Sequence, residues 1–461
     1  MITARAWAGR HYAVYGLARS GLATVRALLA SGATVTAWDE REVARAALKS
    51  SPAVAGEGDR SPSATGGGAP PSVAGATATS PARAGEDQLT LAPLDDLSGI
   101  DALVLSPGVP LNTHPLAARA REAGVEIIGD IELFARARPE LPAHNVVGIT
   151  GTNGKSTTTA LVHHILKTAG VPTTMGGNIG LPILAQNPLP AGGVYVLELS
   201  SYQIDLTQSL DCDVAVLLNI TPDHLDRYDS FEAYAASKAR LFDMSSGETV
   251  IVGSDAPTRS IASRHPRASG DPASSLKLDP RFRGGDALVG PHNEQNILAA
   301  LLTAQALGIA DEQIADALHT YPGLPHRMER VANRDGVLFV NDSKATNAES
   351  AAPALAAFER VRWIVGGLAK TEDLGPAADH LGHVAKAYTI GKAGPMFARL
   401  LEARGVAVEP CETLENAVNR AAADSQPGDV VLLSPASASF DQFRDFEARG
   451  EAFRNAVGAL S

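Results

Sequence analysis

The stretch Val147-Gly-Ile-Thr-Gly-Thr-Asn-Gly-Lys-Ser-Thr-Thr-Thr159 decides the fold of the middle of this chain. A short apolar strand runs into a glycine-containing loop, and a helix is expected to begin near Ser156. Backbone N–H groups and the amino end of the helix then face one point and favour a phosphate group. The usual phosphate-loop signature has a glycine where this chain has Ile149. We therefore predict a nucleotide site with a variant sequence, in which Lys155 neutralises phosphates and Ser156 binds Mg²⁺. The alternative is a glycine-rich turn with an exposed lysine.

Composition bounds the class of protein. The chain has 461 residues, of which 45% are hydrophobic and 20% charged, as in ordinary globular proteins. No apolar run approaches the ~20 residues of a membrane helix, and the first residues lack the apolar core of a signal peptide. We therefore expect a cytoplasmic protein without a membrane span. The chain is separately expected to be a monomer. The net charge of −12 argues against nucleic-acid binding. The only cysteines, Cys212 and Cys411, form no disulfide or zinc pattern.

Alternating apolar strands and helical segments predict an α/β protein with three domains. They are a Rossmann-like domain over residues 1–130, a central P-loop ATPase-like domain over 131–323, and a carboxyl-terminal α/β domain over 324–461. Residues 50–85 contain almost no large apolar side chain, which predicts a disordered insertion. Residues 264–286 are predicted to form a surface loop.

The first domain opens with a strand, a turn, a helix and a second strand between Tyr12 and Asp39. This order resembles the first unit of a dinucleotide-binding fold, although the spacing of Gly16 and Gly21 is looser than G-x-G-x-x-G. A tight turn without a ligand remains an alternative. A buried strand further on ends in a turn at Ser106.

Polar residues follow two strands beside the predicted phosphate loop. Glu198 lies near the end of one strand, and His224 follows the next. Carboxyl ends of parallel strands meet at one edge of the sheet, where open α/β sheets bind ligands. Each residue alone is more often structural. Lys238 lies on a predicted helix among apolar residues and, taken alone, is interpreted as a solvent-exposed lysine.

Eight motifs together resemble those of the Mur ligases: "TGTNGKST", "GGNIG", "ELSSYQ", "NITPDHLDRY", "HNEQN", "HRME", "NDSKATN" and "SPASASFDQFRDFEARGEAF". They cover nearly the whole chain except the two irregular segments. The resemblance implies an ATP-dependent amide ligase. The "GDIELF" and "SPASASFDQF" motifs favour the activity that adds D-glutamate to UDP-N-acetylmuramoyl-L-alanine through an acyl phosphate, in cytoplasmic peptidoglycan precursor synthesis and hence in cell shape and division.

The resemblance also implies roles for individual residues of this chain. Lys155, Glu198, His224 and Lys238 are the implied catalytic residues, and Lys238 is implied to be carbamylated. Ser156, Glu198, His224 and Lys238 are the implied Mg²⁺ site. The implied ATP contacts are Gly151, Thr152, Asn153, Gly154, Lys155, Ser156, Thr157, Asn296, Arg327 and Asp342. The implied contacts to UDP and the rest of the nucleotide substrate are Arg19, Ser20, Asp39, Ser106, Pro107, Gly108, Asn178, Gln203 and His224. The implied D-glutamate contacts are Lys344, Thr346, Lys370, Ser439, Phe440 and Phe446. Without the resemblance, these carboxyl-terminal residues are equally well interpreted as surface lysines, a loop serine and core aromatics.

Two alternative functions remain open from the sequence. One is another amide ligase of the same superfamily, such as the L-alanine-adding enzyme or folylpolyglutamate synthase. The other is a non-catalytic regulator that binds a nucleotide on the same loop. The presence of Glu198, His224 and Lys238 beside the loop argues against the regulator.

Overall fold

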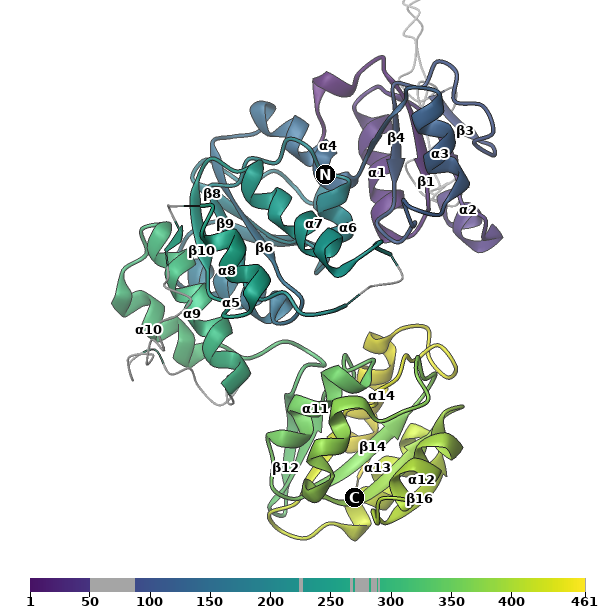
Figure 1. Ribbon diagram of the computed structural model, residues 1–461, viewed down its shortest axis with the longest axis vertical. Helices are drawn as coiled ribbons and strands as arrows, with labels where there is room; N and C mark the ends of the chain where they lie inside the picture. Colours follow the sequence, from purple (N-terminus) through teal and green to yellow (C-terminus); the bar gives the residue numbers. More distant parts are fainter. Residues whose placement is uncertain are drawn as a thin grey trace, which may run out of the picture. The chain divides into compact units, whose positions relative to one another are not determined.

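The computed structural model describes residues 1–49, 88–223, 227–265, 268–269, 282, 288 and 291–460. The chain divides into two compact units, one formed by residues 1–277 with 298–314 and the other by 278–297 with 315–461. Within the described residues, three sheets carry the fold, two in the first unit and one in the second. Figure 1 shows helices flanking the strands of each sheet, so the predicted α/β class is confirmed. The three domain boundaries stay a prediction.

The first sheet is parallel, with strand order β3-β2-β1-β4-β5. The chain passes from β1 through helix α1 to β2, as the opening sequence predicts, and later returns to the other side of β1 with β4. The carboxyl ends of β1 and β4 therefore border the crevice where such sheets hold ligands. The elements are β1 (His11–Tyr15), α1 (Arg19–Ala30), β2 (Thr34–Trp38), α2 (Glu42–Lys49), β3 (Leu89–Leu91), β4 (Ala102–Leu105), α3 (Pro115–Glu122), β5 (Glu126–Ile128) and α4 (Asp130–Ala137), with short 3₁₀ turns at Arg5–Trp7 and Arg138–Glu140.

The second sheet is also parallel, with order β11-β10-β9-β6-β8-β7. Strand β6 lies between β8 and β9, so the predicted phosphate loop leaves the sheet with a strand on either side. The elements are β6 (His144–Thr150), α5 (Lys155–Thr168), β7 (Thr173–Gly177), a 3₁₀ turn (Ile183–Ala185), β8 (Gly193–Glu198), α6 (Ser201–Asp205), β9 (Val214–Leu217), α7 (Phe231–Asp243), β10 (Glu248–Ile251), α8 (Ala256–Ala262) and β11 (Ala268–Ser269), followed by α9 (Pro291–Ala306) and α10 (Asp311–Thr320).

The third sheet has order β12-β13-β17-β14-β15-β16 and is parallel except for the β12–β13 pair. Its elements are β12 (Glu329–Arg334), β13 (Val337–Asn341), α11 (Ala348–Ala356), β14 (Val361–Gly366), a 3₁₀ segment (Gly375–His383), β15 (Val384–Ile390), α12 (Gly394–Glu402), β16 (Val408–Glu412), α13 (Leu414–Asp424), β17 (Val430–Leu433) and α14 (Phe446–Ala459).

Both faces of the third sheet are covered, which explains why β14 is buried along its whole length. Successive side chains of a strand point to opposite faces. Trp363 belongs to a core cluster with Leu355 of α11 and Phe397 of α12, whereas Ile364 belongs to a second cluster with Phe453 of α14. The sheet therefore separates two apolar cores.

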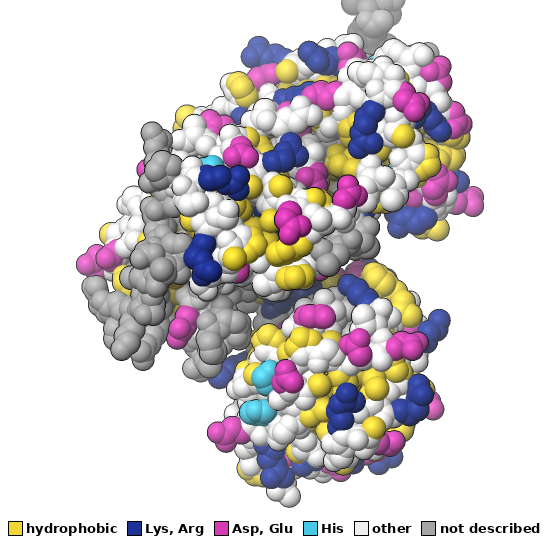
Figure 2. All heavy atoms as spheres, viewed as in Figure 1, with side chains coloured by type: hydrophobic (Ala, Val, Ile, Leu, Met, Phe, Trp, Pro, Cys, Tyr) yellow, Lys and Arg dark blue, Asp and Glu magenta, His cyan; other side chains and the backbone are white. Residues whose placement is uncertain are grey.

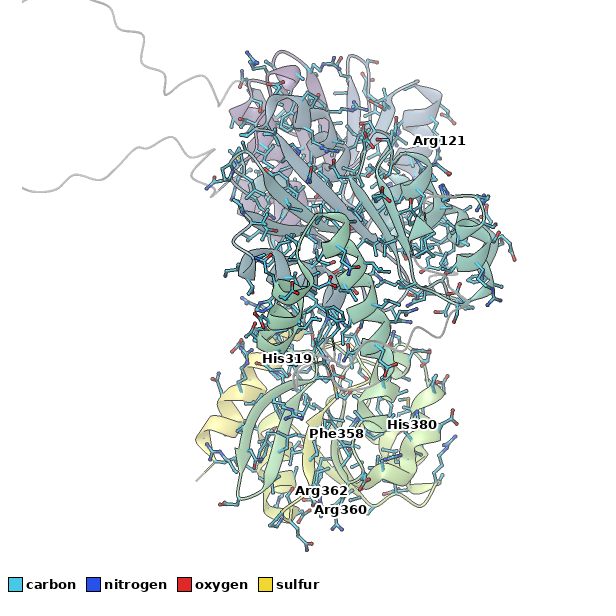
Figure 3. The ribbon with its side chains drawn as sticks, turned by 90° about the vertical axis from the view of Figure 1, so that its left-hand side faces the viewer. Arg121, His319, Phe358, Arg360, Arg362 and His380 are labelled. Carbon is cyan, nitrogen blue, oxygen red and sulfur yellow. The ribbon has the colours of Figure 1, made fainter. Side chains whose placement is uncertain are left out.

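An ion pair network closes one end of this sheet. Asp429 is buried just before β17 and pairs with Arg360 at 2.6 Å and with Arg362 of β14 at 2.9 Å. Figure 3 labels both arginines, which lie close together at that end. The network joins two neighbouring strands, and a buried carboxylate needs such partners.

The structure can be compared with several expectations from the sequence. The insertion at 50–85 lies outside the described residues. Most of 264–286 does too, but the expected loop is wrong at Ala268–Ser269, which pair with β10 as a short parallel strand. Both cysteines are free and buried. No helix in the described ranges is long and apolar enough to span a membrane. Figure 2 shows acidic and basic side chains interspersed over the visible face.

Asp130 is a buried carboxyl at the start of α4, beside Ser20 of α1. Burial raises its pKa to about 6, and the backbone N–H of Ile131, at 3.1 Å from Oδ1, opposes that rise. Its Oδ2 has no hydrogen-bond partner among the described residues. The folded state therefore retains a proton that the unfolded chain loses near pH 4.

Stability is thus expected to fall as the pH rises from about 4 through about 6, and to level off above that. Asp130→Asn supplies a permanently neutral side chain and should remove most of this fall, leaving the variant more stable than the parent by on the order of 2 kcal/mol at pH 8. Thermal unfolding between pH 4 and pH 8 checks this. Asp95→Asn, at an exposed carboxylate, is the matched control. A parallel pH dependence of Asp130→Asn and the parent would contradict the assignment.

Candidate active site

The phosphate loop has the predicted local structure. Strand β6 ends at Thr150, and α5 begins at Lys155 with Gly154 as its N-cap residue. Gly154 has φ of 84° and Gly151 has φ of 154°, conformations that glycine adopts without strain. A Cβ at position 151 would also approach the Leu218 Cβ to 3.0 Å. The loop therefore depends on both glycines, and the amino end of α5 is available to an anion.

Ile149 explains the variant signature. Its side chain is fully buried in the first-unit core, and its position still belongs to β6, where it lies in register with Glu198 of β8. The strand therefore continues past the place where the usual signature begins its loop. A glycine here would remove core packing, whereas the phosphate-facing part of the loop begins at Gly151.

A neighbouring segment holds the loop in place. The backbone N–H of Thr152 donates to the Asn219 carbonyl at 2.8 Å, and that of Asn153 donates to Asn219 Oδ1 at 2.9 Å. Thr152 Oγ1 also donates to the Thr221 carbonyl at 3.1 Å. Asn219 and Thr221 follow β9, within the motif "NITPDH". The motif alone does not reveal these bracing contacts.

Lys155 is turned back across its own loop. Its Nζ donates to the Gly151 carbonyl at 2.9 Å and to the Thr152 carbonyl at 2.7 Å. The side chain is half-buried rather than extended into solvent. The cation is thus held over the loop by two of the loop's own carbonyls.

Glu198 ends β8 beside the loop and is buried. Its Oε1 accepts a hydrogen bond from Asn178 Nδ2 at 3.0 Å, and its Oε2 has no hydrogen-bond partner among the described residues. Buried carboxylate oxygens normally have partners, because removing them from water is costly. An unsatisfied oxygen at a ligand-binding sheet edge suits a hard cation such as Mg²⁺.

Lys238 contradicts its interpretation as a solvent-exposed lysine. It is only 1% exposed on α7, and its Nζ donates to the Gly151 carbonyl at 3.0 Å. The Nζ also lies 4.7 Å from the centre of the Tyr234 ring. Burial, with the charge of Lys155 as a second cause, holds the pKa of Lys238 well below its usual value. The helix pattern alone could not reveal this, because Gly151 comes from a distant segment, whereas Tyr234 lies one turn earlier on α7.

His224 lies outside the described residues, so its place in the site stays a prediction. No group of three or more His, Cys, Asp and Glu side chains that could hold a metal occurs in the part of the chain that the structure describes. The implied Mg²⁺ ligands are not such a group, because they include a serine, a lysine and His224 itself. Ser156 is buried in the first turn of α5, and Thr157 follows it.

The glycine turn of the first sheet is tightly built. A Cβ on Gly21 would lie 1.8 Å from the Gly16 carbonyl oxygen, and one on Gly16 would lie 2.8 Å from Ser106 Oγ. Ser106 Oγ donates to the Gly16 carbonyl at 2.7 Å. The turns after β1 and β4 are therefore joined, which places Ser106 and Pro107 beside the amino end of α1 and Ser20.

Asp39 follows β2 and also supports this turn. Its Oδ2 accepts from the Leu17 N–H at 2.7 Å, and Arg41 donates to both carboxylate oxygens. Burial raises the pKa of Asp39, but the bonds from Arg41 and Leu17 outweigh burial and leave it below its usual value. The carboxylate is therefore ionised and ordered.

Arg19 and Gln203 also make contacts in this unit. Arg19 Nη2 donates to the Gly180 carbonyl at 2.7 Å. Gln203 is buried, and its Oε1 accepts from the Ser200 N–H at 3.1 Å in a capping box at the start of α6. The carbonyl end of Gln203 is thus occupied by the helix cap, and its contact to a substrate stays a prediction.

The predicted carboxyl-terminal residues lie in the second unit. Lys344 Nζ lies 4.0 Å from the centre of the Phe446 ring, and the Lys344 N–H donates to the His326 carbonyl at 3.0 Å. Phe440 is 70% exposed, so its interpretation as a core aromatic is wrong. Ser439 is buried, Thr346 is half-buried and Lys370 is exposed.

The predicted ATP contacts in the second unit are Asp342, Asn296 and Arg327, and they have different hydrogen-bond partners. Asp342 is buried and accepts from Ser434 Oγ at 2.8 Å. Burial raises the pKa of Asp342 to about 7, and the Ser434 bond opposes the rise. Asn296 is buried on α9 with its Nδ2 bonded to Asn293 Oδ1 at 3.1 Å. The Arg327 N–H donates to the Leu324 carbonyl at 3.3 Å.

Comparison with known proteins places this geometry in a family. Residues 149–273 match the Mur ligase middle domain, and residues 326–437 match the Mur ligase, glutamate ligase domain. A UDP-N-acetylmuramoylalanine–D-glutamate ligase from Novosphingobium aromaticivorans is 55% identical over all of this chain and 97% of its own length. One of the same name from Sphingopyxis alaskensis is 55% identical over the full length of both chains.

Solved structures agree on the fold. A UDP-N-acetylmuramate-alanine ligase from Thermotoga maritima has a TM-score of 0.59 at 17% identity, covering 98% of this chain and 99% of its own. A MurF ligase from the same organism, in complex with ADP, has a TM-score of 0.53 at 18% identity, covering 78% and 90%. Full-length identity to the curated relatives goes further than fold, and it shows that this chain belongs to the Mur ligase family, among the UDP-N-acetylmuramoylalanine–D-glutamate ligases.

Proposed function

We propose that this protein uses ATP to join D-glutamate to UDP-N-acetylmuramoyl-L-alanine by an amide bond, in the synthesis of the peptidoglycan precursor. The observation that carries the proposal is the 55% identity, over the whole chain, to relatives named for that reaction. The phosphate loop, with Lys155 held over it, supports the use of ATP.

The proposed reaction has two steps. A carboxylate is a poor electrophile, so the γ-phosphoryl group of ATP is first transferred to the L-alanine carboxylate, giving an acyl phosphate and ADP. The amine of D-glutamate then attacks the acyl carbon, the bond to the phosphate oxygen breaks, and an amide and inorganic phosphate form with loss of a proton from nitrogen. Lys155 and the amino end of α5 would stabilise charge on the transferring phosphoryl group.

The residues present fit a magnesium site at the loop. Glu198 offers its unpartnered Oε2, and Ser156 lies in the first turn of the helix that follows the loop. Together with His224 they would hold Mg²⁺, which supplies neutralisation of phosphate charge when bound.

Lys238 would complete this site as a carbamate. Its lowered pKa favours a neutral amine, and a neutral amine attacks CO₂ to form an N–C bond with release of one proton. The product is an anion at the end of a buried side chain beside Gly151. An ammonium in this place would repel a metal ion, whereas a carbamate offers oxygen ligands.

The second unit would bind the amino acid. Lys344 and Lys370 would pair with the two carboxylates of D-glutamate, with Ser439, Thr346, Phe440 and Phe446 as further contacts. Asn296, Arg327 and Asp342 would contact ATP. We propose the three domains with the boundaries that the sequence predicts.

The decisive experiment is amino-acid-dependent phosphate release with UDP-N-acetylmuramoyl-L-alanine and MgATP. D-Glutamate is expected to support turnover at least about 10²-fold faster than L-glutamate, L-alanine or glycine, because the site must pair two carboxylates in one stereochemical arrangement. Preference for L-alanine with UDP-N-acetylmuramate would instead identify an L-alanine-adding enzyme. Absence of phosphate release with every amino acid would support a non-catalytic nucleotide-binding protein.

A further inference from the structure

Arg227 connects segments of two different sheets in the first unit. Its Nη2 donates to the Gly108 carbonyl at 2.8 Å, in the turn after β4. Its guanidinium carbon lies 4.4 Å from the centre of the Tyr202 ring, on α6 of the central sheet. One side chain thus holds a turn of the first sheet against a helix of the second.

The segments that Arg227 joins are those that the resemblance assigns to different parts of one substrate. Gly108 belongs to the turn implied to bind UDP. Tyr202 precedes Gln203, an implied contact to the sugar-peptide part. Arg227 itself follows His224 by three positions in the motif "NITPDHLDRY". The resemblance implies no role for Arg227 or Tyr202.

The surroundings of Arg227 favour a positioning role over direct binding. Arg227, Tyr202, Tyr228 and Pro107 border a cavity of about 30 Å³, which has room for about two water molecules and is far smaller than a sugar or a base. The Tyr202 and Tyr228 rings are stacked at 17°, and Tyr228 Oη donates to Asp205 Oδ2 at 2.7 Å. The ring under the guanidinium is therefore itself held in place.

A second guanidinium–carbonyl hydrogen bond links the same two sheets, with the donor on the first sheet and the acceptor in the central region. Arg19, at the start of α1 in the first sheet, donates to the Gly180 carbonyl of the central region at 2.7 Å. Arg227 of the central region donates to Gly108 of the first sheet. Each bridge is a guanidinium–carbonyl bond between an implied nucleotide segment and an implied segment of the reaction site.

We propose that Arg227 is a positioning residue that fixes the distance between the nucleotide-binding turn and the phosphoryl-transfer site, so that only a substrate of the correct length meets both ends. This inference rests on the proposed function. Fixing the two ends before binding reduces the ordering that the substrate must otherwise impose. Arginine suits this task because its planar group stacks on a ring while its edge donates hydrogen bonds, which a lysine ammonium does not reproduce.

The test separates the two ends of the substrate. Arg227→Met retains most of the apolar stem but loses the charge, the stacking and the donor. We expect the Kd of UDP alone to change less than twofold, because UDP would contact only the first sheet, whereas kcat/KM for UDP-N-acetylmuramoyl-L-alanine falls about tenfold. The KM for ATP should remain within about twofold of the parent value. Arg227→Lys should resemble Arg227→Met.

Tyr202→Leu removes the other half of the stack and is expected to lower kcat/KM by a similar factor. The double variant should lose little more than either single variant, since both changes break one contact. Arg119→Met is the matched control, because Arg119 makes a comparable bond to the Leu94 carbonyl away from the implied substrate segments. Thermal unfolding of each variant checks that the fold is retained.

The possible results distinguish the positioning role of Arg227 from the proposed function of the protein. Equal weakening of UDP and of the complete substrate would show that Arg227 serves the nucleotide site alone, and would overturn the positioning role. Unchanged kcat/KM in Arg227→Met would overturn it as well. Failure of the unsubstituted protein to release phosphate with UDP-N-acetylmuramoyl-L-alanine and D-glutamate would instead refute the proposed function.

Discussion

Lys155→Ala is expected to lower the rate of phosphate release by about 10²–10³-fold while the fold remains intact. The ammonium is held over the loop by the Gly151 and Thr152 carbonyls, at the amino end of α5, where phosphate charge would develop. Alanine preserves the helix and the glycine conformations but removes that charge. The measurement is phosphate release at saturating substrates, with circular dichroism and thermal unfolding as tests of folding.

Lys167→Ala is the matched control, because Lys167 is an exposed lysine near the end of the same helix. It should retain turnover within about twofold, since surface substitutions away from special features have small effects. Normal turnover by Lys155→Ala would exclude the phosphate loop as the site of ATP use.

Lys238→Ala is expected to be inactive to a similar degree, with partial recovery in the presence of acetate. The side chain is buried beside Gly151, so its removal leaves a space that a small carboxylate can enter to supply the missing oxygens. Lys238→Arg should not recover activity, because arginine remains cationic at all relevant pH values. Turnover with and without acetate, at constant ionic strength, distinguishes the three proteins.

A spectroscopic measurement makes the carbamate test independent of turnover. After equilibration with ¹³C-labelled CO₂, the parent protein should show a carbamate ¹³C resonance that is absent from Lys238→Ala. Lys167→Ala should keep the resonance. Normal activity in Lys238→Arg, or the same spectrum from Lys238→Ala and the parent, would be incompatible with a carbamate at this position.

Much of the fold was predictable because its signals are local. Apolar runs and glycines alone predict the strand, loop and helix around Gly154. They also predict the strand, helix and second strand between Tyr12 and Asp39. The short strand at Ala268–Ser269 was missed, because two residues of ordinary polarity gain their structure only by pairing with β10. Tertiary pairing of this kind leaves no periodic pattern in the sequence.

The candidate site was predictable in part for the same reason. Glu198 could be placed at the end of β8 from its strand, but the unpartnered Oε2 depends on what surrounds it. Lys238 was misread from its helix, because the Gly151 carbonyl that its Nζ contacts lies far away in the sequence. Arg227 has no local signal at all, because its two partners lie in segments far away in the sequence.

The resting position of Lys155 bears on how the products leave. A lysine with no other partner would hold any phosphate ion that arrived, and free phosphate released by each turnover would compete with the next ATP. Here the ammonium has the Gly151 and Thr152 carbonyls to return to. Exchanging those bonds for one anion is expected to yield a small net gain, so we expect a lone phosphate ion to bind weakly. We expect a triphosphate to offset this exchange through additional contacts along the loop, so that the same two carbonyls weaken the binding of free phosphate more than that of ATP.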